Sequence, residues 1–202
     1  MRRLLLLAIA VLLVSAMPAL AQISGTLHDL RGTIGGSQIC VPCHTPHGAT
    51  PAVPLWNHAL PSPASSYSVY TGSATIDATD LSDFTSADGS ISSLCLSCHD
   101  GTTALGSLVN DPGDITDTTS TLIGDANLGT DLTNDHPVNF TFDAALIAAD
   151  GELQAPSSAI LFGVSADQVE CASCHNVHDD TNEPFLVTTN AASALCLDCH
   201  TK

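Results

Sequence analysis

Four copies of one short motif use every cysteine in this chain of 202 residues. They read CVPCH at 40–44, CLSCH at 95–99, CASCH at 171–175 and CLDCH at 196–200. Two thiols at this spacing lie on one tight turn and reach the two vinyl groups on one side of a porphyrin, and the next histidine then lies beneath the iron. The motifs therefore predict four covalently bound haem c groups. The predicted thioether residues are Cys40, Cys43, Cys95, Cys98, Cys171, Cys174, Cys196 and Cys199, and the predicted proximal ligands are His44, His99, His175 and His200.

Three other interpretations of the cysteines compete with haem attachment. Eight cysteines in an exported chain are compatible with a disulfide framework, two C-x-x-C pairs with a zinc ribbon, and one pair with a thiol redox motif. None of these explains why a histidine follows all four pairs directly. We therefore favour haem attachment.

The N-terminal segment has the pattern of a secretory signal peptide. Two arginines precede a long apolar run, and Ala19-Leu20-Ala21 forms an A-x-A cleavage site. An uncleaved membrane anchor is the alternative, but we expect residues 1–21 to be removed and no later segment to span a membrane. The mature chain, residues 22–202, then keeps two basic residues against 21 acidic ones, a formal charge of −19. Such a charge disfavours nucleic acid and anionic membrane surfaces as partners.

Large side chains are scarce, because aromatic residues make up only 4% of the chain. We expect mostly coil with short helices and little sheet: a multihaem cytochrome c fold organised around four stacked haems, whose apolar faces replace the missing core. Short helices are expected at the four motifs, a further helix within 141–153, and a short strand at 158–163.

The four motifs alternate between two types. The first and third read C-x-x-C-H-x-x-H and are called A motifs below; the second and fourth read S-x-L-C-L-x-C-H and are called B motifs. One single domain is therefore predicted to contain two two-haem units, at about 28–110 and 134–202, joined by an acidic, turn-rich loop.

Both methionines leave with residues 1–21 and Lys202 is the only lysine, so the second axial ligand of each iron is a histidine or the position is open. His47 cannot ligate the iron bound by His44, since three residues cannot wrap the ring, so it is expected to ligate another haem. His178 has the same position in the third motif. We predict His28, His47, His136 and His178 as distal ligands, with His58 as the spare candidate.

These features resemble a known family, the extracellular tetrahaem cytochromes of the outer-membrane cytochrome E type, which polymerise into conductive filaments. The resemblance lies in HDL at 28–30, ICVPCHTPHGA at 39–49, PLWN at 54–57, LCLSCHDGT at 94–102, NDHPV at 134–138 and CHNVH at 174–178. It implies a continuous chain of bis-histidine haems, a homopolymer, and one distal histidine donated to the neighbouring subunit. We favour His28 as that donor, because a segment near the terminus can leave its own subunit at least cost.

The resemblance makes electron transfer along an extracellular or cell-surface filament the leading expectation, with redox partners upstream and an extracellular acceptor. A monomeric tetrahaem carrier, secreted or periplasmic, is the alternative. A reductase would need an open iron, and no C-x-x-C-K motif is present, so no enzymatic activity is expected. A non-redox surface protein is a further alternative that nothing in the sequence favours.

Overall fold

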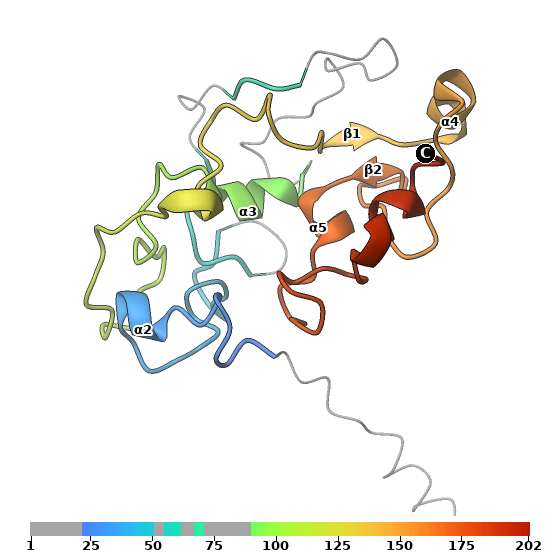
Figure 1. The fold of residues 1–202 in the computed structure, drawn as a ribbon. Helices are drawn as coiled ribbons and strands as arrows, with labels where there is room; N and C mark the ends of the chain where they lie inside the picture. Colours follow the sequence, from blue (N-terminus) through green and yellow to red (C-terminus); the bar gives the residue numbers. More distant parts are fainter. Residues whose placement is uncertain (1–21, 51–54, 62–66, 71–89) are drawn as a thin grey trace, which may run out of the picture.

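The structure, a computed structural model, describes residues 22–50, 55–61, 67–70 and 90–202. The predicted signal peptide lies outside these residues. Within them the chain is mostly coil with a few short helices and one two-stranded sheet (Figure 1). The α-helices are α2 (Arg31–Ile34), α3 (Ser92–His99), α4 (Ala144–Asp150) and α5 (Cys171–Cys174). The strands are β1 (Phe140–Thr141) and β2 (Gln168–Val169), and the 3-10 helices are η2 (Gly124–Ala126), η3 (Ala191–Ser193) and η4 (Cys196–Asp198). The expected coil with short helices and little sheet is confirmed.

The helix expected within 141–153 is present as α4. It begins after Asp143, whose carboxylate accepts a hydrogen bond from the Leu146 N–H, and it ends at Gly151 in the left-handed conformation that glycine adopts without strain. The ends of this helix therefore follow local capping chemistry.

The strand expected at 158–163 is wrong. Within this segment only Phe162 forms a β-bridge, to Gln168. The N–H groups of Ser157, Ser158 and Ala159 donate instead to the Asp198 carboxylate, at 2.7–3.0 Å. A side chain thus takes the donors that a neighbouring strand would have used.

Each C-x-x-C-H motif closes a single turn. In the first, third and fourth motifs the histidine N–H donates to the carbonyl of the first cysteine, at 2.8, 3.0 and 2.9 Å. The second motif lies inside α3. The helix expected at the first motif is wrong: its turn stops at once, because His44 becomes extended and pairs with Trp56 in a β-bridge.

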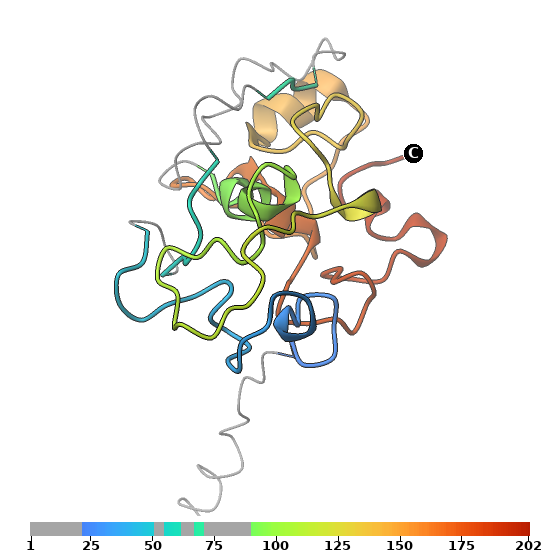
Figure 2. The ribbon, with the colours of Figure 1, turned by 90° about the vertical axis from the view of Figure 1, so that its left-hand side faces the viewer.

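Two helices that carry haem motifs, α3 and α5, lie side by side in the middle of the fold (Figures 1 and 2). Glu170, only 1% exposed, joins them. Its carboxylate accepts hydrogen bonds from the Ser90 hydroxyl and from the N–H and hydroxyl of Ser92, and the Cys171 N–H donates to the Ser92 hydroxyl at 2.9 Å. Burial raises the pKa of Glu170, while the serine donors partly oppose the rise.

Apolar packing is divided into small clusters. Leu96 and Leu132 form one with Tyr67, Val69 and Val138. A second surrounds the sheet and contains Phe140, Phe142 and Val169. None of the helices in the described part of the chain has the length and apolar character to cross a bilayer.

Candidate haem sites

The two A motifs share one backbone arrangement. After each motif the chain returns and forms two hydrogen bonds with it. These are Thr45 N to Leu55 O (2.9 Å) and Asn57 N to Cys43 O (3.0 Å) in the first unit, and Asn176 N to Phe185 O (2.7 Å) and Val187 N to Cys174 O (3.0 Å) in the second. The returning residues Leu55 and Phe185 both have positive φ, 63° and 59°. The two A motifs are therefore held by equivalent turns, and His47 corresponds to His178.

Three of the predicted distal histidines each face one predicted proximal histidine. The ring centres are 6.1 Å apart for His28 and His99, 6.1 Å for His44 and His178, and 6.3 Å for His136 and His200. These pairs join segments that are far apart in the sequence. Three of the four proximal ligands thus have a distal candidate in the same chain.

These separations suit an iron between the two rings. An imidazole nitrogen binds a transition metal at about 2 Å, and the ring centre lies about 1 Å behind that nitrogen, so opposed axial imidazoles have centres about 6 Å apart. The interplanar angles of 67°, 15° and 77° are all compatible with two axial ligands, because each ring can rotate about the axis through its nitrogen.

Backbone carbonyls orient three of the predicted ligands. Nδ1 of His99 lies 2.7 Å from the Ala126 carbonyl, that of His136 2.8 Å from the Pro137 carbonyl, and that of His175 3.0 Å from the Pro184 carbonyl. A carbonyl can only accept, so Nδ1 carries the proton and Nε2 keeps its lone pair for a metal.

Partial loss of solvent favours the neutral imidazole at two distal positions, half-buried His28 and the more exposed His178. The pKa of His28 is lowered by burial and by nearby His99, and the pKa of His178 by burial and by nearby His44. Phe185 packs against His28 with ring centres 4.5 Å apart. A neutral ring is the form that binds iron.

His47, His175 and His58 complete the histidine set. His47 and His175 are exposed, and within the described residues neither has a ring contact with another histidine. The structure therefore does not bring His47 to any of the proximal ligands. His58 is 1% exposed, and burial lowers the pKa of its ring.

The cysteines give little support to the three alternatives to haem attachment, which are a disulfide framework, a zinc ribbon and a thiol redox motif. All eight are free, which gives no support to a disulfide framework. Within the described residues no three or more histidine, cysteine or acidic side chains gather as a metal site, as a zinc ribbon would require. Burial raises the pKa of Cys43 to about 11 and that of Cys98 to about 12, the opposite of an activated redox thiol, whereas contact with Cys95 lowers the pKa of Cys171.

Thiols of different motifs lie close together. Cys95 of α3 and Cys171 of α5 are in hydrogen-bonding contact, and this contact together with burial raises the pKa of Cys95. The Trp56 indole N–H donates to the Ser97 hydroxyl at 3.1 Å, which ties the first A motif to α3. Porphyrins attached at these motifs would be neighbours.

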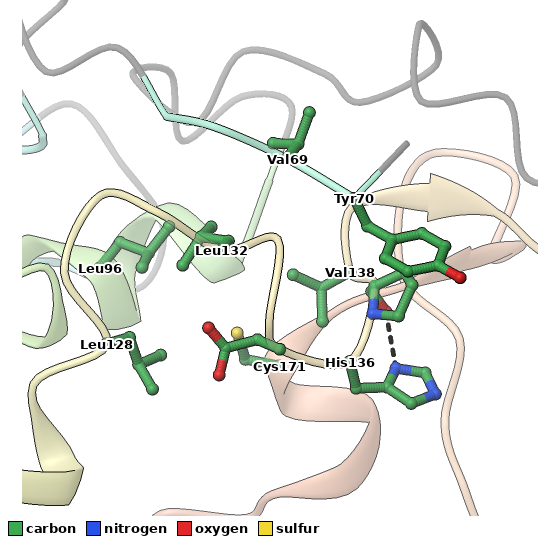
Figure 3. A pocket seen from close by; sticks show the side chains of 10 residues that line it. Val69, Tyr70, Leu96, Leu128, Leu132, His136, Val138 and Cys171 are labelled. Atoms are coloured by element: carbon green, nitrogen blue, oxygen red, sulfur yellow. Dashed lines mark hydrogen bonds between the residues drawn. The ribbon is translucent and has the colours of Figure 1, made fainter. Parts of the chain in front are cut away.

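An apolar pocket lies beside α3 and α5 (Figure 3). Leu96, Leu132 and Val138 line it, with the Cys171 thiol and the predicted ligand His136 at its edge. Cys171 belongs to the third motif, whereas His136 faces His200 of the fourth, so this apolar wall lies between two predicted haem sites. The donor set, the ring separations and this wall all fit haem c.

Some supporting groups were not found from the sequence. The carbonyls that orient the histidines carry no side-chain signal, and neither Glu170 nor Asp198 stood out among 21 acidic residues. A proline with apolar neighbours follows each A motif in the sequence, PLW at 54–56 and PFL at 184–186. The sequence does not show that the Pro184 carbonyl orients His175.

Comparison with known proteins supports the coarse assignment. Residues 163–202 match the family model of the doubled CXXCH motif. That segment contains the third and fourth motifs with their four cysteines. No curated protein matches the chain significantly. The matched motif indicates covalent c-type haem and electron transfer of the multihaem cytochrome kind.

Proposed function

We propose that the mature chain, residues 22–202, carries electrons through four bis-histidine haem c groups, and that copies of it polymerise into an extracellular conductive filament. The histidine pairs at 6.1–6.3 Å are the observation that carries this proposal. In each pair, one histidine is a predicted proximal ligand from a C-x-x-C-H motif and the other is a predicted distal ligand.

Haem c bound at these sites would supply a one-electron Fe(III)/Fe(II) couple. The chain's own residues fix the attachment points on single turns, orient Nε2 through backbone carbonyls, and cover the apolar faces. With imidazoles on both sides of an iron, no position is left for a substrate, so the proposal is of an electron carrier and not of an enzyme.

Location and partners belong to the same proposal. The predicted leader at residues 1–21 would export the chain, and the mature charge of −19 would keep it off anionic membranes and nucleic acid. An upstream reductant and an extracellular acceptor would be its redox partners.

The proposal is tested on protein secreted by a host with the c-type haem attachment machinery. Mass spectrometry of the denatured chain is expected to show loss of residues 1–21 and gain of four haems, and EPR to show low-spin iron. Replacing both cysteines of one motif with serine is expected to remove one haem. Fewer than four haems in the wild type, or mostly five-coordinate iron in its assembled form, would overturn the proposal.

Assembly is measured separately, by negative-stain microscopy across salt and pH. Filaments are expected. Small, monodisperse particles under all conditions would remove the filament part of the proposal and leave the monomeric carrier.

A further inference from the structure

His58 is the histidine to which the four motifs give no role, and its ring is buried without a hydrogen bond. The residue is 1% exposed, and neither Nδ1 nor Nε2 has a hydrogen-bond partner among the described residues. Burial lowers the pKa of the ring, and the nearby Leu105 carbonyl partly opposes this change without reaching hydrogen-bonding geometry. A buried imidazole without a partner costs stability, so this ring calls for a partner that the chain itself does not provide.

The backbone around His58 is extended, which fixes the side on which its ring lies. Trp56 pairs with His44, and His58 pairs with Leu108, in β-bridges. Alternate side chains of extended backbone lie on the same side, so Trp56 and His58 share one side. Asn57, between them, faces the other side, where its amide donates to two backbone carbonyls at 2.8 and 3.1 Å.

The side that Trp56 and His58 share is the side of the first haem motif. The Trp56 ring lies against the ring of His44, the predicted proximal ligand, with centres 6.0 Å apart. The Asn57 N–H donates to the Cys43 carbonyl at 3.0 Å, which ties this segment to the motif itself. The His58 ring therefore lies towards the space around a haem attached at residues 40–44.

The chemistry of haem c supplies the acceptor that His58 lacks. Each haem c has two propionate groups, and carboxylates are strong hydrogen-bond acceptors. Among the described residues no acidic side chain acts on the His58 ring. A carboxylate beside the ring favours its protonated form, in which one nitrogen donates to the carboxylate and the other points to the Leu105 carbonyl. We propose that His58 binds and orients a propionate of the haem attached at the first motif.

Axial ligation suits His58 less well than this role. Three other histidines, His28, His136 and His178, each lie opposite a predicted proximal ligand with ring centres 6.1–6.3 Å apart. Within the described residues the His58 ring has no such contact, and it is covered by protein. A ring in this position can reach the edge of a haem without closing an axial position.

The charge of the chain gives the propionate a reason to need this donor. The mature chain has a formal charge of −19, and Arg31 and Lys202 are each paired with a carboxylate. Negative charge near the iron favours Fe(III) over Fe(II), and a donor on the propionate offsets part of that charge. His58 is therefore expected to raise the reduction potential of one haem in four. This inference rests on the proposed function, because it requires haem at the first motif.

The test uses haem-loaded protein that is isotope-labelled only in its propionate carboxyl carbons, through carboxyl-labelled aminolevulinate in the growth medium. Infrared spectra of the reduced minus the oxidised protein then report on the propionates. His58→Phe removes both ring nitrogens but fills the space, and His58→Gln keeps an amide donor. Leu105→Ala is the control, because it loosens the packing beside His58 and leaves the ring in place.

The wild type is expected to show a labelled band of a hydrogen-bonded carboxylate. This band should disappear in His58→Phe, shift part of the way in His58→Gln and stay in Leu105→Ala. In a potentiometric titration followed by haem absorbance, one haem in four should have a lowered potential in His58→Phe and a less lowered one in His58→Gln. EPR should show low-spin iron in all four proteins.

An unchanged band and unchanged potentials in His58→Phe would overturn the inference. Equal changes in Leu105→Ala would also overturn it, because they would assign the effect to packing, and so would high-spin iron in His58→Phe, which would make His58 an axial ligand. If His58→Phe does not fold, a His58→Gln band identical to that of the wild type overturns the inference instead. In each case four covalent haems in the wild type leave the electron carrier standing, whereas failure of the proposed function would appear as missing haems.

Discussion

The Asp198 carboxylate lies inside the fourth motif and accepts hydrogen bonds from three backbone N–H groups and the Ser157 hydroxyl, at 2.6–3.0 Å. Burial opposes its ionisation, but these donors, led by the Ala159 N–H, lower the pKa from 3.8 to about 2. The unfolded chain therefore binds more protons between these two values. The contribution of Asp198 to stability is complete above about pH 4 and is lost as the pH falls through about 2.

Asp198→Asn is expected to lower the free energy of unfolding by about 2 kcal/mol near neutral pH, because hydrogen bonds to a charged acceptor are replaced by weaker ones. The variant should also lose less stability than the wild type on acidification. Guanidinium unfolding of the haem-loaded protein, followed by circular dichroism at several pH values, measures both effects. Equal acid sensitivity of the two proteins would show that Asp198 does not carry the effect.

A second prediction at the scale of residues separates the paired histidines from the spare one. His136→Ala removes the ring that faces His200, so one haem in four is expected to become high-spin and accessible to cyanide. His58→Ala removes a buried ring from the core and is expected to lower stability without changing the iron spin state. EPR with and without cyanide distinguishes them. A high-spin signal in His58→Ala would make His58 a ligand.

At the scale of elements, the junction of α3 and α5 depends on Glu170. Glu170→Ala leaves the hydroxyls of Ser90 and Ser92 buried without this acceptor, so a loss of about 2–4 kcal/mol is expected. Glu170→Gln keeps an oxygen that can accept and should lose less. Thermal unfolding of the haem-loaded variants checks this order. Equal losses would indicate that the serines find other partners.

Gly106 marks a close approach between two loops. A Cβ at this position would lie 2.0 Å from the Asp117 carbonyl oxygen, whereas a Cβ on Gly32 in α2 would meet nothing within 4 Å. Gly106→Ala is expected to cost about 2–3 kcal/mol through overpacking. Gly32→Ala is the matched control and should be neutral or slightly stabilising, because alanine favours a helix. Thermal unfolding compares them, and equal melting temperatures would refute the clash.

Local features of this fold were predictable because their causes lie close together in the sequence. The single turn of each C-x-x-C-H motif and helix α4 with its Asp143 cap follow from a few neighbouring residues. The absent strand at 158–163 depends instead on Asp198, far along the chain. The pairing of His44 with His178 is also non-local. A list of histidines could name candidate ligands but could not match them, so it could not show that His28 lies opposite His99 of its own chain.

At the scale of the whole molecule, charge opposes assembly. The mature chain has a formal charge of −19, and both of its basic residues are engaged within the chain: Arg31 contacts Asp29 at 2.7 Å and Lys202 contacts Glu152. A neighbouring copy therefore offers few unengaged cations. Any contact between copies has to overcome repulsion that falls off with the Debye length, about 30 Å at 0.01 M salt and about 10 Å at 0.1 M.

Polymers of the wild-type holoprotein are therefore expected to lengthen as salt rises from about 0.01 M to about 0.2 M, since screening weakens the repulsion but leaves an iron–nitrogen bond intact. Sedimentation velocity at fixed protein concentration measures the change. Polymers that lengthen at low salt would instead require attraction between opposite charges on neighbouring copies. The two engaged basic residues are poorly placed to provide it, so this result would contradict the prediction.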